Sequence, residues 1–307
     1  MPRLSIPIPW GSDGTRGGLP LALLAVALPA AYMAYVLRQS ARRTTASASI
    51  TPPDPLVGRR PSEAKGNSEA GEDDGGDTLV IIPPAVLAAL DNYVISRERI
   101  VSEAVPLQKI LPDLRRGVEV WQEEADGGKS EVEDEGEGEG EGGRRLLQTY
   151  LATTMRVFSW TPQAFAMKSM VSRLPGGAAH ADTFSTGYLD TCAFERGDRV
   201  CGVYRVRVHI LSSRGERILL DLSPPEGWKG PVVSGGLVCG FVVEEKGGER
   251  LVRFVNETVM WRRKDEKPTL LEGTVSRWLH TLTVGWMMAR GVEAVTGTHG
   301  RTKDKTS

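Results

Sequence analysis

The stretch from residue 199 to residue 290 constrains the fold most, because a strand pattern there gives way to a helix pattern. In Tyr204–Ile210 every second residue is apolar, which indicates a strand with one buried face. Two more alternating runs follow, at Pro231–Glu244 and Leu251–Trp261. The segment therefore predicts several strands of one sheet.

The next segment, Pro268–Arg290, has the spacing of a helix. Its predicted apolar stripe consists of Leu271, Val275, Trp278, Leu279, Leu282 and Trp286. Since the strands before it have an apolar face of their own, we expect this stripe to pack on them. The predicted fold class is α+β, with a curved antiparallel sheet packed on a long C-terminal helix.

Two helices are predicted before the sheet, which has five strands in all. Arg144–Phe158 has apolar residues at helical spacing, and Thr161 followed by Pro162 reads as an N-cap with a first-turn proline that starts the second helix. Thr183–Phe194 and Glu216–Leu222 complete the five strands. Further candidates upstream are a helix that begins at Pro83–Pro84 and a strand at Gly117–Glu123.

An uncharged run of 19 residues, Leu19–Leu37, predicts a single transmembrane helix, because about 20 residues cross a bilayer. The cations Arg38, Arg42 and Arg43 follow it, which places the C-terminal side in the cytosol. The alternatives are a cleaved signal peptide and an organelle-targeting segment, but the run is longer than a usual signal-peptide core. We expect the endoplasmic reticulum or another endomembrane, with a mitochondrial membrane as the alternative.

The composition divides the chain into seven parts. Much of the first half is rich in Gly, Pro, Ser and charged residues, which bury too little apolar surface to order a chain. The predicted parts are an N-terminal tail (1–18), the transmembrane helix (19–37), a disordered linker (38–77), a partly ordered segment (78–125), an acidic disordered loop (126–143), the α+β domain (144–297) and a disordered tail (298–307).

Several functional classes receive no support from the sequence. The net charge of −1 gives no argument for nucleic-acid binding. The three cysteines, Cys192, Cys201 and Cys239, lack the spacing of a zinc site and cannot form a complete disulfide framework, so we expect small apolar residues of the sheet in a reducing compartment. Because the motifs of hydrolases, metalloproteases and nucleotide-binding proteins are missing, we expect no metal and no cofactor.

Polar residues that interrupt apolar strands are the candidate site residues. Glu257, His209 and Arg207 are candidates for acid–base and oxyanion roles, because a carboxylate with a His or Arg can polarise a carbonyl and move a proton. The alternative is that these charges pair along the outer face of the sheet. Candidates for substrate binding are Asn256, Tyr204, Trp278 and Trp228. His280 is expected to be structural, with a catalytic base as its alternative.

The predicted order of elements resembles the helix-grip arrangement of START and Bet v 1-like proteins, one strand short, over about Gly117–Thr296. The phrases TFSTGYLD, GDRVCGVYRV, RFVNETVMWR and LLEGTVSRWLH are similar to uncharacterised proteins of filamentous fungi, some of them in secondary-metabolite gene clusters. The resemblance implies an apolar cavity between sheet and helix.

The sequence leaves three functions open. The first is an accessory enzyme of polyketide-type metabolism, like a cyclase or dehydratase, that acts on a hydrophobic intermediate beside partner enzymes. The second is a protein that binds a lipid or another hydrophobic small molecule without chemistry. The third is a structural membrane adaptor. A cavity between sheet and helix, and the polar groups inside it, distinguish the three.

Overall fold

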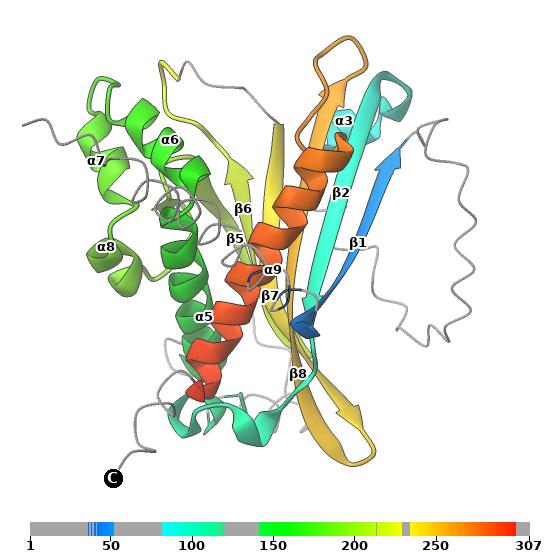
Figure 1. Cartoon of the computed structure of the whole chain (residues 1–307), viewed down its shortest axis with the longest axis vertical. Helices are drawn as coiled ribbons and strands as arrows, with labels where there is room; N and C mark the ends of the chain where they lie inside the picture. Colours follow the sequence, from blue (N-terminus) through cyan, green and yellow to red (C-terminus); the bar gives the residue numbers. More distant parts are fainter. Residues whose placement is uncertain are drawn as a thin grey trace, which may run out of the picture.

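The computed structural model describes residues 42–51, 82–116, 118–119, 141–212, 214–228 and 234–298, together with residues 36, 38 and 40. The elements within them (Figure 1) are β1 (Thr44–Thr51), α3 (Pro84–Leu87), η1 (Leu90–Asn92), β2 (Tyr93–Ser102), β3 (Val105–Pro106), η2 (Leu107–Lys109), α5 (Glu141–Ser159), α6 (Pro162–Val171), α7 (Gly177–Asp182), α8 (Thr186–Thr191), β4 (Arg199–Val200), β5 (Tyr204–Ser212), β6 (Gly215–Leu222), β7 (Ser234–Lys246), β8 (Glu249–Arg263) and α9 (Thr274–Thr296).

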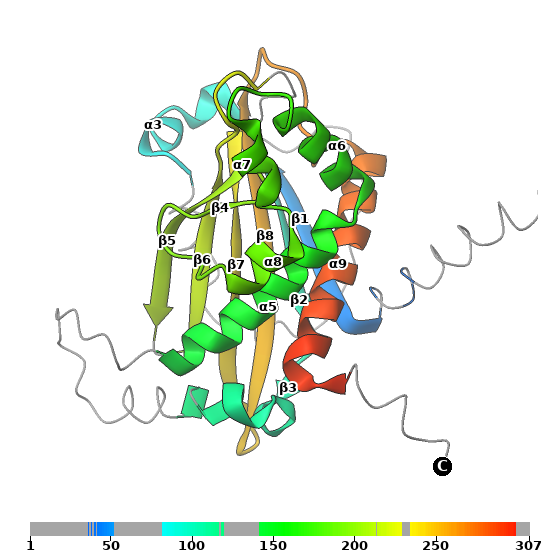
Figure 2. The ribbon, with the colours of Figure 1, turned by 90° about the vertical axis from the view of Figure 1, so that its left-hand side faces the viewer.

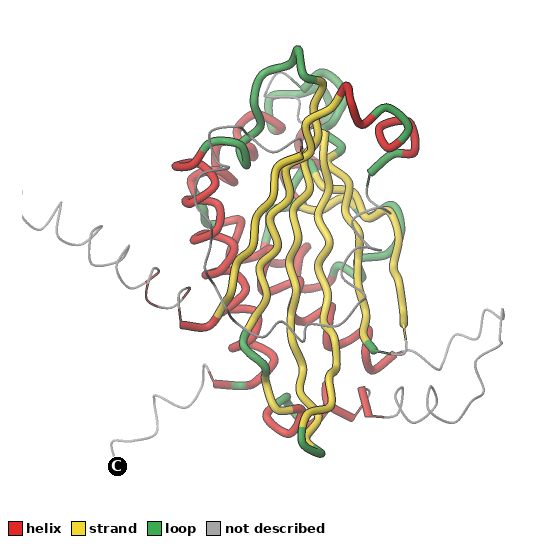
Figure 3. Tube along the Cα trace, turned by 90° about the vertical axis from the view of Figure 1, so that its right-hand side faces the viewer, coloured by secondary structure: helices red, strands yellow, loops and turns green. Residues whose placement is uncertain are grey.

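The strands form one eight-stranded antiparallel sheet in the order β1-β2-β8-β7-β6-β5-β4, with β3 paired to β8. The helices α5 and α9 lie on one face of this sheet (Figures 1 and 2), and Figure 3 views the sheet from its other face. The predicted α+β class, the antiparallel sheet and the C-terminal helix are confirmed.

The main core lies between the sheet and the helices. On the helix-facing side of β8, the ring of Phe254 stacks on that of Tyr150 from α5, with centroids 4.5 Å apart. The two long helices touch where α9 has Gly291, because a Cβ there would lie 2.6 Å from Cδ2 of Tyr150. On the other face of the sheet, a smaller cluster joins Val259 and Trp261 to Val86 of α3.

Several local predictions are confirmed. Thr161 caps α6, since its hydroxyl accepts a hydrogen bond from the amide of Ala164 at 3.2 Å. Pro84 begins α3, as expected for a proline in a first helical turn. The alternating runs Tyr204–Ile210 and Leu251–Trp261 lie within the strands β5 and β8.

The prediction of a linker over residues 38–77 is wrong for Thr44–Thr51, which form the edge strand β1. This strand is mostly exposed, so its order comes from main-chain pairing with β2 and not from apolar burial. The strand β2, which pairs with β8, was also missed. Residues 52–77 lie outside the described part of the chain.

Two strand predictions are wrong in the middle of the chain. Thr183–Phe194 was predicted to be a strand but contains the short helix α8, because the hydroxyl of Ser185 accepts a hydrogen bond from the amide of Tyr188 and caps that helix. Within the candidate strand Gly117–Glu123, the two described residues, Val118 and Glu119, are helical.

The helix α9 begins at Thr274, later than predicted, and its predicted apolar stripe does not face the sheet throughout. Val275, Trp278 and Leu279 are exposed, while Gly285 and Met288 are buried. The helix carries two apolar surfaces, and periodicity by itself does not say which of them meets the sheet.

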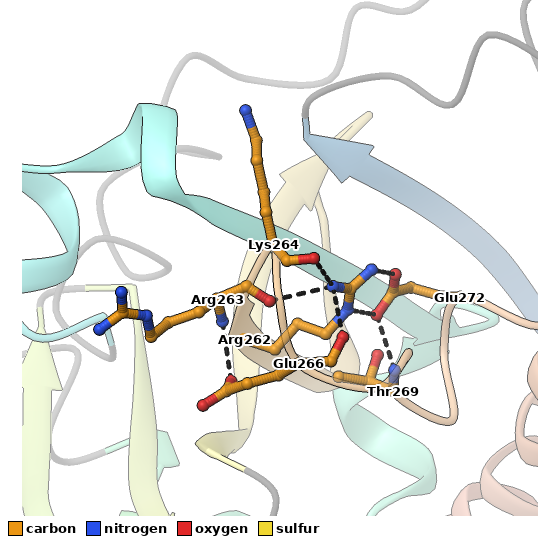
Figure 4. Close-up of polar contacts among 6 residues, drawn as sticks. All are labelled: Arg262, Arg263, Lys264, Glu266, Thr269 and Glu272. Atoms are coloured by element: carbon orange, nitrogen blue, oxygen red, sulfur yellow. Dashed lines mark hydrogen bonds and ion pairs between the residues drawn. The ribbon is translucent and has the colours of Figure 1, made fainter.

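The turn between β8 and α9 is held by Arg262 (Figure 4). Its guanidinium binds both carboxylate oxygens of Glu272, at 2.8 and 2.6 Å, and also donates to the carbonyls of Arg263, Lys264 and Glu266. Glu272 falls within the range predicted for the helix, Pro268–Arg290. It lies before the helix and accepts the amide of Thr269 at 2.7 Å, so it is part of a clamp that sets where α9 begins.

Among the residues that the structure describes, no helix has both the length and the apolar character needed to cross a membrane. Except for Val36, the predicted transmembrane segment Leu19–Leu37 lies outside those residues, as do the tail 1–18, the acidic segment 126–140 and residues 299–307.

Candidate functional site

The space between the sheet and α9 contains a cavity of about 50 Å³. Sites for drug-sized ligands have volumes of about 300–1,000 Å³, so this cavity has room for water molecules and not for a lipid. The residues around it come from α5, α6, β5, β7, β8 and α9, and the polar ones are Thr154, Gln163, Tyr204, Asn256, Thr258, His280 and Thr283.

Two of the four predicted binding residues line this cavity. Asn256 lies on the helix-facing side of β8 and accepts a hydrogen bond from the hydroxyl of Tyr150 at 3.0 Å. Tyr204 reaches the cavity from β5. Trp278 is exposed on α9, and Trp228 packs half-buried against the core from its loop, so these two do not join a common site.

The three predicted catalytic residues are not brought together. Glu257 lies on the face of the sheet opposite α9, where both of its carboxylate oxygens bind the guanidinium of Arg97, at 2.8 and 2.9 Å. Arg207 pairs with Asp221 at 2.9 Å on the same outer face. A bulge between Val206 and Val208 turns His209 to the helix side. The structure therefore does not gather the three around one site: Glu257 and Arg207 form ion pairs on the outer face, and His209 lies on the opposite face.

His209 contacts a different carboxylate. Its Nε2 meets Glu216 of β6, whose side chain is buried, and this pair lies on the sheet face that the helices cover. The pair joins two neighbouring strands, so its position is that of a cross-strand contact within the sheet.

A second His–carboxylate pair joins α9 to the sheet. Glu98 of β2 is 2% exposed, and its two oxygens meet Nδ1 of His280 and the hydroxyl of Thr281. A carboxylate on Nδ1 fixes the orientation of an imidazole, and His280 also borders the small cavity. Sequence reasoning missed Glu98 because β2 was missed; the β-branched residues of YVISRERIVS were the available signal.

Two tyrosines and a thiol at or next to the cavity have raised pKa values. Burial raises the pKa of Tyr150 well above its usual range, and the hydrogen bonds with Thr154 and Asn256 offset only part of this effect. Burial likewise raises the pKa of Tyr204, and it raises the pKa of the Cys239 thiol to about 12. These groups are therefore protonated at neutral pH, which suits hydrogen bonding and not nucleophilic attack.

A larger hollow is an open groove of about 750 Å³ beside the C-terminal half of α9. One wall is the chain from Ser102 through β3 and η2 to Pro112, and the other is the α9 surface from Met288 to Thr298. We call it the α9 groove. Its apolar lining residues are Ala104, Val105, Pro106, Ile110, Leu111, Pro112, Met288, Ala289 and Val292.

Charged side chains border the α9 groove. Arg43, just before β1, contacts Oε1 of Glu293 at 2.5 Å, and Arg290 contacts Oε2 of the same carboxylate at 2.8 Å. Glu103 and Lys109 complete the charged border on the opposite wall. The groove thus combines an apolar lining with charges of both signs, a lining that fits an amphipathic molecule better than a simple anion or cation.

No known protein family, curated protein or solved structure matches this chain. Among the described residues, no three His, Cys, Asp or Glu side chains gather into a group that could hold a metal ion.

Proposed function

We propose that this chain is a membrane-anchored protein that binds a hydrophobic small molecule, without transforming it, in the α9 groove. The single observation that carries the proposal is the groove itself, whose volume of about 750 Å³ falls in the range of about 300–1,000 Å³ typical of ligand sites. The resemblance noted from the sequence suggests a lipid-like or polyketide-type ligand.

The alternatives from the sequence have less support. A helix-grip chamber needs space between sheet and helix, where the described structure leaves about 50 Å³. An accessory enzyme of the kind predicted needs Glu257, Arg207 and His209 around one substrate, but they lie on two faces of the sheet. Binding in the α9 groove is therefore better supported than catalysis or binding in a helix-grip chamber.

The groove also lies where the proposed anchor joins the domain. Arg43 borders the groove, and the uncharged run Leu19–Leu37 ends only six residues before it. A hydrophobic ligand could pass between the bilayer and the groove with a short path through water. This placement supports a role in holding or transferring a membrane-soluble molecule.

A photoactivatable fatty acid in vesicles that contain the full chain tests the proposal. We expect cross-links to Val105, Leu111 or Val292, mapped by mass spectrometry. Ala104→Trp places a ring in the groove and should remove these cross-links, whereas Ala85→Trp, on exposed α3, should keep them. Cross-links confined to residues 19–37, with the groove unlabelled in the natural chain, contradict the proposal.

A further inference from the structure

We infer that the first turns of α9 form a membrane-surface contact, in which Val275, Trp278 and Leu279 lie in the lipid headgroup region. This inference rests on the anchor of the proposed function and concerns a surface outside the α9 groove. The occupant is the bilayer that holds the anchor.

The three side chains form one stripe. They stand at positions i, i+3 and i+4 of α9, so they share a helix face, and they are 70%, 49% and 45% exposed. Single exposed apolar residues are common, but adjacent ones mark interaction sites. A tryptophan in such a stripe suits the membrane interface, because its ring is apolar and its N–H needs a polar partner.

The N-terminal chain meets α9 directly beside the stripe. The hydroxyl of Ser40 donates to the carbonyl of Leu282 at 3.1 Å, and Leu282 is one helical turn after Trp278. Gly285 makes this approach possible, since a Cβ there would lie 3.1 Å from Cβ of Ser40. Figure 2 shows the short blue segment before β1 alongside α9.

The uncharged run ends close to the contact between Ser40 and α9, as the position of Val36 shows. Val36 is buried and lies one helical turn before Ser40, and it belongs to Leu19–Leu37. A bilayer that takes up this run must therefore come within a short distance of the stripe. The position of Val36 therefore favours the bilayer as the surface that covers the stripe.

The charge around the junction fits the same occupant. Arg38 and Arg42 are exposed between the uncharged run and β1. Cations at this position attract anionic lipid headgroups, with about 1 kcal/mol for each Lys or Arg near the surface. The junction therefore presents cations beside an apolar stripe, the combination found in interfacial helices.

The test uses the full chain in vesicles of phosphatidylcholine and phosphatidylserine. An environment-sensitive NBD fluorophore on Val275→Cys reports on the stripe, and the same fluorophore on Leu211→Cys, exposed on β5, is the matched control. The native cysteines are buried and should escape labelling. Interfacial helices enter the bilayer by about 5–10 Å, so a spin label near the headgroups should quench the Val275 reporter and leave the Leu211 reporter unchanged.

A second variant separates the stripe from the anchor. Trp278→Glu should abolish the quenching at Val275 while the chain still floats with the vesicles. If the natural chain floats with the vesicles but the Val275 reporter is not quenched, the inferred membrane contact of the stripe is wrong. The proposed anchor and the proposed ligand site in the α9 groove are not affected by that result. A chain that does not float overturns the anchor and the stripe together. Shielding from aqueous iodide without lipid quenching indicates a second protein copy and also overturns the inference.

Discussion

The buried carboxylate of Glu98 contacts Nδ1 of His280, although 182 residues separate the two in the chain. Glu98 belongs to β2 and His280 to α9, so the contact joins the N-terminal part of the sheet to the C-terminal helix. The hydroxyl of the neighbouring residue Thr281 donates a hydrogen bond to the other oxygen of this carboxylate. This site holds the position of α9 over the sheet.

Replacing His280 by Ala should therefore destabilise the domain. The change leaves one oxygen of Glu98 buried without its partner, and a buried group in that state costs about 1–3 kcal/mol. Urea unfolding measures the loss as a lower midpoint with an unchanged slope. Asp265→Ala, in an ion pair whose carboxylate side is 75% exposed, is the control and should change stability by less than about 0.5 kcal/mol. Equal effects of the two variants would show that the Glu98 contact contributes nothing.

The clamp between Arg262 and Glu272 should make stability depend on pH. Burial acts to raise the pKa of Glu272, but the hydrogen bonds from Arg262 and Thr269 outweigh it and hold the pKa below its usual value. A carboxylate with a lowered folded-state pKa stabilises the fold above its unfolded pKa, and this stabilisation is lost as the pH falls through the folded pKa.

Glu272→Gln should thus cost about 1–3 kcal/mol at neutral pH. The difference from the natural chain should shrink below about pH 4.3, the ordinary pKa of Glu. Denaturant midpoints between neutral and acidic pH measure it. A difference that stays constant down to the acid-unfolded range contradicts the assigned role of the carboxylate.

Gly291→Ala should loosen the contact between α5 and α9. Its Cβ would lie 2.6 Å from Cδ2 of Tyr150 and 2.7 Å from Oγ1 of Thr154, so one helix must shift. Overpacking of this kind costs about 1–3 kcal/mol, more than the gain in helix propensity of about 0.5–1 kcal/mol. Thermal unfolding measures the loss.

The matched control is Gly187→Ala in α8, where an added Cβ meets nothing within 4 Å. This variant should leave the transition temperature unchanged or raise it slightly. If Gly291→Ala behaves in the same way, the two long helices have more freedom than the close approach implies.

The cysteines should be inert in the folded chain. Cys192, Cys201 and Cys239 are free and buried, and burial raises the pKa of the Cys239 thiol to about 12. A disulfide reagent at about pH 8.5, the usual pKa of a thiol, should label none of the three until denaturant is added. Fast labelling of Cys239 in the folded chain would show that the small cavity opens to solvent.

The strands and helices with strong local patterns were predictable. The alternation from Tyr204 to Ile210 marked β5, and Thr161 with Pro162 marked the start of α6. The edge strand β1 has no such signal, because TTASASIT is held by pairing with β2. The opposite error occurred at Thr183–Phe194, where the local pattern predicted a strand. The segment contains the helix α8, whose N-cap is Ser185.

The candidate sites likewise include features that local patterns predicted and features that they did not. The period of a strand put Asn256 and Glu257 on opposite faces of β8, but it did not say which of the two faces meets the helices. The bulge after Val206 changed that period, so the face of His209 could not be read from the pattern. The α9 groove arises from segments about 180 residues apart in the chain, and no local pattern describes it.

By itself the sequence determined the class of fold and the strands and helices with strong local patterns, because these depend on periodicities within short segments. Only the tertiary structure decided which surface of α9 meets the sheet, that Glu98 and His280 touch, and where the molecule is hollow. These features depend on packing between distant segments, and packing follows the shapes and volumes of the side chains that meet.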